Sequence, residues 1–165
     1  VNFPTSIYEN PPSLINDLAN SMLNNSIKPE VEIFDLAMLY NAIQMVKDGL
    51  LLEPLHVQFV FGIRNALPAK RTILEFQINE LKNLLPQSTW TAAGLGKSQL
   101  IVNEWSLELG GHCRTGLEDN IKYDKTRLAN GNEELVERLA LLSNKFNRPV
   151  ATPTEAREIL GLGQV

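Results

Sequence analysis

The sequence predicts an α/β fold, and within that class a TIM (β/α)8 barrel of which this chain covers about the last five β/α units. Strand-like and helical segments alternate along the chain, which predicts parallel strands joined by helical crossovers. Polar residues recur on one face of the predicted strands, whereas strands of a doubly wound sheet are apolar on both faces. A closed barrel has eight strands and about 250 residues. We therefore expect residues 1–165 to be a single domain, the C-terminal part of a barrel lacking its N-terminal strands.

The first elements follow from apolar periodicity and from prolines. Residues 1–3, Val-Asn-Phe, are strand-like, and residues 12–24 repeat leucine and isoleucine at helical spacing after Pro11 and Pro12, which suit a first helical turn. Alternating residues then predict a strand at 29–35. A helix is expected at 36–49, where Gly49 is a suitable end.

The second half repeats the alternation. A strand rich in valine and phenylalanine is expected at 56–62, a helix at 72–85 that Pro86 closes, a strand at 88–96, a helix at 98–111, a strand at 110–120 and a helix at 132–146. In the tail, Thr152 can cap a last helix, because Pro153 suits its first position and Glu155 follows three residues after the cap.

Composition excludes several classes of protein. The chain is 44% hydrophobic and 21% charged, as is ordinary for a globular domain. A net charge of -4 gives no electrostatic footprint for nucleic acid, and no apolar run approaches the roughly 18 residues of a membrane span. One cysteine allows no intramolecular disulfide and predicts a reducing, cytoplasmic location.

The stretch GGHCRTGLEDN at 110–120 carries charges on what is expected to be a buried strand. Side chains of a strand alternate, so Arg114 and Glu118 share one face. Such charges are costly unless they are paired, bind a metal or do chemistry; a buried ion pair and a functional site both satisfy this condition. Asp119 faces the other way in a regular strand, so a role as a base requires the backbone to turn there; its alternative is to cap the following turn.

Further polar residues lie on the other strands. Glu30 and Glu32 share a face, where two close carboxylates raise the pKa of one of them, and Glu32 lies nearer the carboxyl end of its strand. Gly94 and Gly96 precede a helix whose N-terminus can receive a phosphate or carboxylate, although a tight strand-to-helix turn explains them equally well. Glu32 is therefore the functional candidate of the pair, and both interpretations of the two glycines stay open.

His56, His112 and Cys113 are interpreted as structural. Both histidines come at predicted strand starts, the end of a barrel that serves stability, so polar packing is the expected role. The cysteine should point outward against helices and be inert.

Several motifs in this order resemble the β-keto acid cleavage enzymes, a metal-dependent TIM-barrel family. The motifs are VNF, KPEVEIFD, HVQFVFG, TWTAAGLGKSQ, GGHCRTGLEDN, NEELVERL and RPVATPTEAREILGL, and they span essentially the whole chain. The resemblance implies cleavage of a 3-oxo acid with acetyl-CoA, giving acetoacetate and a new CoA thioester. It also implies a zinc ion, held by a His-x-His pair early in the barrel and by a glutamate on the last strand.

Matched position by position, the resemblance assigns roles to five residues. The metal-binding glutamate matches Glu118, the adjacent carboxylate proposed as general base matches Asp119, and the arginine four residues before the metal ligand matches Arg114. Glu32 matches a glutamate that contacts substrate, and Asn2 matches an asparagine of the VNF strand that binds substrate. We count Asp119, Arg114 and Glu32 as catalytic, and Glu32, Arg114, Asn2, Gly94 and Gly96 as substrate-binding. Arg114 can bind the substrate carboxylate directly or organise the neighbouring carboxylates.

Two features depart from the family pattern. The sequence has no His-x-His, because its only histidines are His56 and His112, and two of the three expected zinc ligands would lie upstream of Val1. The loop after the HVQFVFG strand reads GIRNALPA, with Asn65 and Ala66 where the family usually carries glycines that let a ligand approach the backbone. The second departure bears on how CoA and substrate fit.

Two other readings of the sequence stay open. The chain could be a catalytically inactive partial barrel that self-associates, because exposed sheet edges invite pairing. It could also be another (β/α) barrel enzyme that binds a sugar phosphate at the Gly94–Gly96 turn. Whether the chain is an inactive partial barrel or part of an enzyme, protection of its exposed sheet edges predicts a homo-oligomer. If it is part of an enzyme, a 3-oxo acid and acetyl-CoA are its small-molecule partners.

Overall fold

The computed structural model describes residues 7–163 as an α/β fold built on one parallel sheet. Its elements are α1 (Pro12–Asn24), β1 (Glu30–Ile33), α2 (Leu36–Lys47), β2 (His56–Phe61), α3 (Arg71–Leu84), β3 (Thr89–Gly94), a 3-10 turn (Gly96–Ser98), α4 (Gln99–Glu108), β4 (His112–Cys113), α5 (Asn132–Lys145) and α6 (Pro153–Ile159). The predicted alternation of strands and helices is confirmed. The strand expected at residues 1–3 lies outside the described residues.

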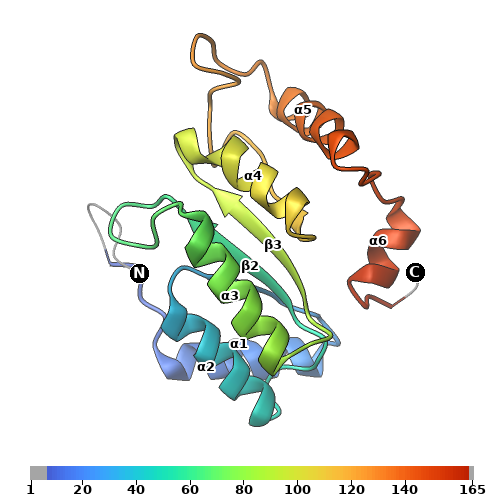
Figure 1. Cartoon of the computed structure of the whole chain (residues 1–165). Helices are drawn as coiled ribbons and strands as arrows, with labels where there is room; N and C mark the ends of the chain where they lie inside the picture. The colour runs from blue at the N-terminus through green and yellow to red at the C-terminus, as the bar shows by residue number, and fades with distance from the viewer. Residues whose placement is uncertain (1–6, 164–165) are drawn as a thin grey trace.

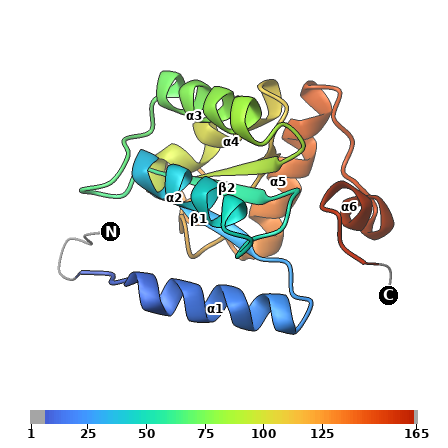
Figure 2. The ribbon, with the colours of Figure 1, turned by 90° about the horizontal axis from the view of Figure 1, so that it is seen from below.

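The four strands lie in the order β1-β2-β3-β4, and each neighbouring pair is parallel. Parallel crossovers are right-handed, so strands added in one direction place their connecting helices on the same face of the sheet. Figure 2 shows α2 between α1 and α3, and Val102 of α4 packs into the same core. These helices cover one face of the sheet, and the opposite face carries polar side chains such as Glu32, Gln58 and Thr91.

The hydrophobic core lies between the sheet and this helical layer. Val57, Phe59 and Phe61 of β2 point into it and are fully buried, together with Leu39 of α2 and Leu74 of α3. The residues between them on β2, such as Gln58, face the other way because strand side chains alternate. This alternation confirms the polar face that was predicted from the sequence.

The last strand is much shorter than expected. A strand was predicted over 110–120, but β4 contains only His112 and Cys113, which pair with Thr91 and Ala92 of β3. The chain then leaves the extended conformation and forms a turn at 117–119. The prediction that Glu118 lies on a strand is therefore wrong, since it belongs to this turn.

The C-terminal helix α6 lies beside the amino ends of the first strands. Its predicted start is confirmed: Thr152 accepts from the Glu155 backbone N–H, and the Glu155 side chain accepts from the Thr152 backbone N–H. At its other end, the carbonyl of Leu160 accepts a hydrogen bond from Lys28, which precedes β1. Figure 1 shows α5 and α6 as separate helices after the sheet. Within residues 7–163, no helix has both the length and the apolar character needed to cross a membrane.

Candidate active site

Arg114 is the centre of a charged cluster at the carboxyl ends of the strands. It follows β4 directly, and its Nε and Nη2 atoms donate to the two oxygens of Asp119, each at 2.9 Å. Its Nη1 donates to Glu32 Oε1 at 3.0 Å, and Nη2 also pairs with Glu118. One guanidinium therefore holds the three carboxylates that the sequence had singled out.

The turn after β4 brings Asp119 to the same side as Arg114. The backbone N–H groups of Asp119 and Asn120 donate to the carbonyl of Gly116, at 3.3 and 3.1 Å. The carbonyl of Asp119 in turn accepts from the N–H of Gly96 at 2.8 Å, which ties the turn to the loop after β3. This turn supplies the change of direction that a role of Asp119 as a base requires.

Side chains of α4 and α5 form hydrogen bonds with the backbone of the same turn. Asn132 accepts from the N–H of Leu117 at 2.8 Å. Gln99, which is fully buried, donates to the carbonyl of Gly116 and accepts from Arg138, each at 3.1 Å. Sequence reasoning missed these residues, because their partners lie 15 to 39 positions away and no local pattern marks them.

Burial decides the protonation of the cluster. Burial and the hydrogen bond with Glu118 raise the pKa of Asp119 to about 6, although the Arg114 guanidinium acts in the opposite direction. The hydrogen bond with Asp119, followed by the charge and the hydrogen bond of Arg114, lowers the pKa of Glu118. Of the two carboxyls, Asp119 therefore holds the proton below about pH 6, and near neutral pH it is mostly ionised and can accept a proton.

Glu32 enters the cluster from β1. Its Oε1 atom accepts from Gln58 Nε2 at 2.7 Å as well as from Arg114. Its neighbour on the same face, Glu30, has its pKa raised by burial and by the charge of Glu32, as expected for two close carboxylates. A cavity of about 390 Å³ extends past Gln58, Thr91 and Arg114 toward α5.

The two glycines of the β3–α4 turn have backbone reasons to be glycine. A Cβ at Gly94 would lie 2.5 Å from the carbonyl oxygen of Ser98 and 2.9 Å from Cβ of Val102, so strand and helix approach too closely for a side chain. Gly96 has φ of +56°, in the left-handed region. Their assignment to substrate binding stays a prediction, as does that of Asn2, which lies outside the described residues.

The histidines lie at the amino ends of their strands, and His56 Nε2 is 3.5 Å from the Glu30 carboxylate. His56 begins β2 and contacts Thr89 through Nδ1 at 2.8 Å and Thr91 through Nε2 at 3.0 Å, and burial lowers its pKa to about 4. His112 begins β4, with its ring 6.0 Å from that of His56. This is the polar packing that the sequence predicted. Among residues 7–163, no group of three histidine, cysteine, aspartate or glutamate side chains is placed to hold a metal ion.

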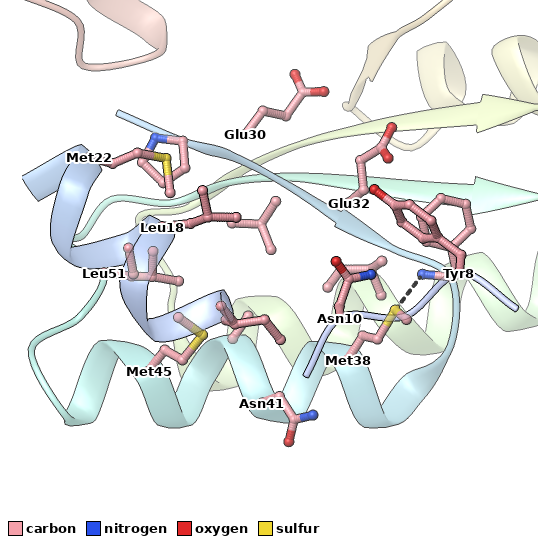
Figure 3. Close-up of a pocket in the computed structure, with 17 residues that line it drawn as sticks. Tyr8, Asn10, Leu18, Met22, Glu30, Glu32, Met38, Asn41, Met45 and Leu51 are labelled. Carbon is pink, nitrogen blue, oxygen red and sulfur yellow. Dashed lines mark hydrogen bonds between the residues drawn. The ribbon is translucent and has the colours of Figure 1, made fainter. Parts of the chain in front are cut away.

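A second cavity, of about 340 Å³, runs along β1 between α1 and α2. Figure 3 shows Leu18, Met45 and Leu51 on this side of β1, whereas the carboxylates of Glu30 and Glu32 point to the other side. Its lining is largely apolar, and of the charged cluster only Glu32 borders it. The candidate site is therefore the Arg114 cluster.

A parallel β/α sheet with a buried carboxyl, an arginine and two further carboxylates at the carboxyl ends of its strands defines an enzyme-like site of the (β/α) class. A family model described as "beta-keto acid cleavage enzyme" matches residues 1–162. The chain belongs to this family, and the resemblance drawn from its motifs is confirmed.

Two characterised relatives indicate what such proteins do. The chain is 52% identical over 98% of its length to a 3-oxoadipate:acetyl-CoA acetyltransferase of Cupriavidus necator. It is 37% identical over 96% of its length to a 3-keto-5-aminohexanoate cleavage enzyme of Acetoanaerobium sticklandii. It spans 57% of the length of each relative. Both relatives are enzymes, so the comparison does not favour the reading as an inactive fragment.

Solved structures agree on the fold. The apo structure of ObcA matches with a TM-score of 0.79 at 22% identity, over 95% of this chain and 41% of that one. A ternary complex of ObcA with a C4-CoA adduct and oxalate matches with a TM-score of 0.76 at 22% identity, over 94% of this chain and 42% of that one. At this identity the likeness shows the fold alone, an α/β fold with a parallel sheet as in the ObcA TIM barrel.

Proposed function

We propose that the protein carrying this chain cleaves a 3-oxo acid with acetyl-CoA, giving acetoacetate and a CoA thioester. The observation that carries the proposal is the gathering of Glu32, Glu118 and Asp119 around Arg114 at the carboxyl ends of parallel strands, where (β/α) barrels hold their active sites. Family membership supports it, and so does the name of the C. necator relative, which contains 3-oxoadipate and acetyl-CoA. We further propose that the four strands form an arc of a TIM barrel.

Asp119 is assigned the role of general base. Its side chain is 4% exposed, and its pKa of about 6 lets it accept a proton near neutral pH. The proton in question is the acidic one on the carbon between the keto and carboxyl groups of the substrate. The paired hydrogen bonds from Arg114 fix the carboxylate plane, so the base does not need to be reoriented before it reacts.

Arg114 organises the carboxylates and can also meet the substrate. Four of its donor contacts go to Asp119, Glu32 and Glu118. The Glu118 side chain is 77% exposed, so it is the partner that leaves most easily. Its departure would free an N–H group for the substrate carboxylate, for which the planar guanidinium is well suited. Glu32 would then border the same substrate, with Asn2 and the Gly94–Gly96 turn as further proposed contacts.

Zinc dependence is the part of the proposal that the described residues do not complete. A zinc site with an open position needs three protein ligands, and residues 7–163 offer no such group. Glu118 is the single ligand that we assign, because its carboxylate is exposed and carboxylate oxygen is an ordinary zinc donor. Two further ligands would have to come from outside residues 7–163, and we therefore derive no chemical step through the metal. Its role when bound would be that of a Lewis acid toward the keto oxygen.

Location and assembly belong to the same proposal. We place the protein in the cytoplasm, because a single cysteine suits a reducing compartment. We expect a homo-oligomer, because β1 and β4 are the border strands of the described sheet and strand edges favour pairing.

The test uses purified protein carrying this chain, with 3-oxoadipate and acetyl-CoA as the trial substrates. Formation of acetoacetate and of a CoA thioester is measured together with bound zinc. Glu118→Gln is expected to lose both metal and activity, whereas Glu137→Gln, a control at an exposed position of α5, should keep both. An active, zinc-loaded Glu118→Gln protein would remove Glu118 from its role. A panel of 3-oxo acids without turnover would reject the function.

A further inference from the structure

Gln58 is a buried amide in the middle of β2, on the same face as the Arg114 cluster. Its exposed fraction is 2%, and a buried amide is costly unless its hydrogen bonds are made. The strand register places Gln58 between Glu32 of β1 and Thr91 of β3. Neither the family match nor the motifs assign a role to this glutamine.

The contact of Gln58 with Glu32 is short and directed. Gln58 Nε2 donates to Glu32 Oε1 at 2.7 Å, and the same oxygen accepts from Arg114 Nη1 at 3.0 Å. Two donors on one oxygen fix the plane of the carboxylate and leave Oε2 as the oxygen that can meet a ligand. The cavity beside the cluster is lined by both Gln58 and Arg114.

Arg114 alone does not determine the orientation of Glu32. Its guanidinium is shared among three carboxylates, and the Glu32 side chain is half-exposed, so it keeps rotational freedom that a second contact must restrict. Among the hydrogen bonds of the described residues, Gln58 bonds to Glu32 and not to Glu118 or Asp119. It is therefore the group that distinguishes Glu32 from the other two.

We propose that Gln58 is a positioning residue, which holds the Glu32 carboxylate in the orientation that contacts the 3-oxo acid. The inference deepens the proposed function and rests on it for the identity of the substrate. The alternative is that Gln58 only fills space in the sheet. The two roles differ in one respect, because a positioning residue acts through Glu32 and a packing residue does not.

A double-mutant cycle separates these roles. Gln58→Leu, which keeps the volume and removes the donor, is expected to lower kcat/KM for 3-oxoadipate about 10- to 100-fold, since small misplacements of substrate contacts cost about that much. The KM for acetyl-CoA should stay unchanged. In a Glu32→Ala background the same substitution should cost less than twofold. Gln77→Leu is the matched control, because Gln77 is 1% exposed and both its amide atoms lack a partner; it should leave kcat/KM unchanged.

Equal losses from Gln58→Leu in the two backgrounds would overturn the proposal, since they would show a role independent of Glu32. Gln58→Asn, which withdraws the amide by one methylene, repeats the cycle if the leucine variant does not fold. If the wild-type protein turns over no 3-oxo acid, the proposed function fails. The contact between Gln58 and Glu32 is then tested by the urea midpoints of the wild type, Gln58→Leu, Glu32→Ala and the double variant. Coupling requires Gln58→Leu to lower the midpoint more when Glu32 is present, and identical shifts would reject it.

Discussion

Replacing Arg114 by methionine tests the electrostatic account of the site. Methionine keeps the unbranched apolar stem of the side chain and removes the charge together with the four donor contacts to Asp119, Glu32 and Glu118. The most affected partner is Asp119, because its side chain is 4% exposed whereas that of Glu118 is 77% exposed. The cost should therefore come mainly from leaving the Asp119 carboxylate buried without its cation.

The size of the effect follows from burial. Removing one partner of a fully buried ion pair costs about 3–5 kcal/mol, whereas exposed pairs contribute about 0–1 kcal/mol. Arg114 is 34% exposed, so solvent screens part of the interaction, and we expect a loss of about 2 kcal/mol in the free energy of unfolding at pH 8. Asp119 has a pKa of about 6, which Arg114 holds down. At pH 5 the carboxyl is already mostly protonated, so the expected loss falls below about 1 kcal/mol.

Urea unfolding of both proteins at pH 5 and pH 8 measures this difference, with Trp90 and Trp105 as fluorescent probes. Arg71→Met is the matched control, since Arg71 also bridges two glutamates, at 2.8 and 2.6 Å, but neither of these carboxylates is buried as that of Asp119 is. Its effect should be smaller and independent of pH in this range. Unchanged stability of Arg114→Met at pH 8, or an equal loss at both pH values, would refute the electrostatic reasoning.

Three further predictions concern other parts of the chain. The kcat/KM should fall as pH decreases through about 6, because protonated Asp119 is no base; a profile flat from pH 5 to 8 would exclude this role. Gly94→Ala should destabilise the protein by about 2 kcal/mol through overpacking against α4, whereas Gly163→Ala, which meets nothing within 4 Å, should be neutral in thermal unfolding. Cys113 should react slowly with thiol reagents at pH 8, since burial raises its pKa to about 11; rapid labelling of the folded protein would contradict this.

Local sequence patterns were sufficient for the elements and for the two faces of the sheet. Helical and strand periodicities depend on residues two to four positions apart, so the alternation of Phe59 and Phe61 with Gln58 could be read directly and agrees with burial in the structure. The cap at Thr152 is equally local and was found. Charge and strand alternation singled out Glu32, Arg114 and Glu118, and the resemblance to a family then assigned roles to them and to Asp119.

The end of β4 depends on tertiary contacts. The alternating residues of 110–120 suit a strand, but the carbonyl of Gly116 accepts from the N–H groups of the turn and from Gln99. These bonds satisfy the Gly116 carbonyl within the turn, and pairing with β3 ends at Cys113. A one-dimensional pattern does not contain the position of α4, and the prediction failed there.

The sequence by itself determined which residues are helical, which strands alternate and which charged residues are candidates for a site. Only the tertiary structure decided that Arg114 joins carboxylates from two places, since Glu32 lies 82 positions away in the chain. It also decided that Gln58 orients Glu32 and that Asp119 is buried enough for its pKa to rise. The physical reason is that burial and hydrogen-bond partners arise from segments brought together by the parallel sheet, and neither quantity is a property of neighbouring residues in the chain.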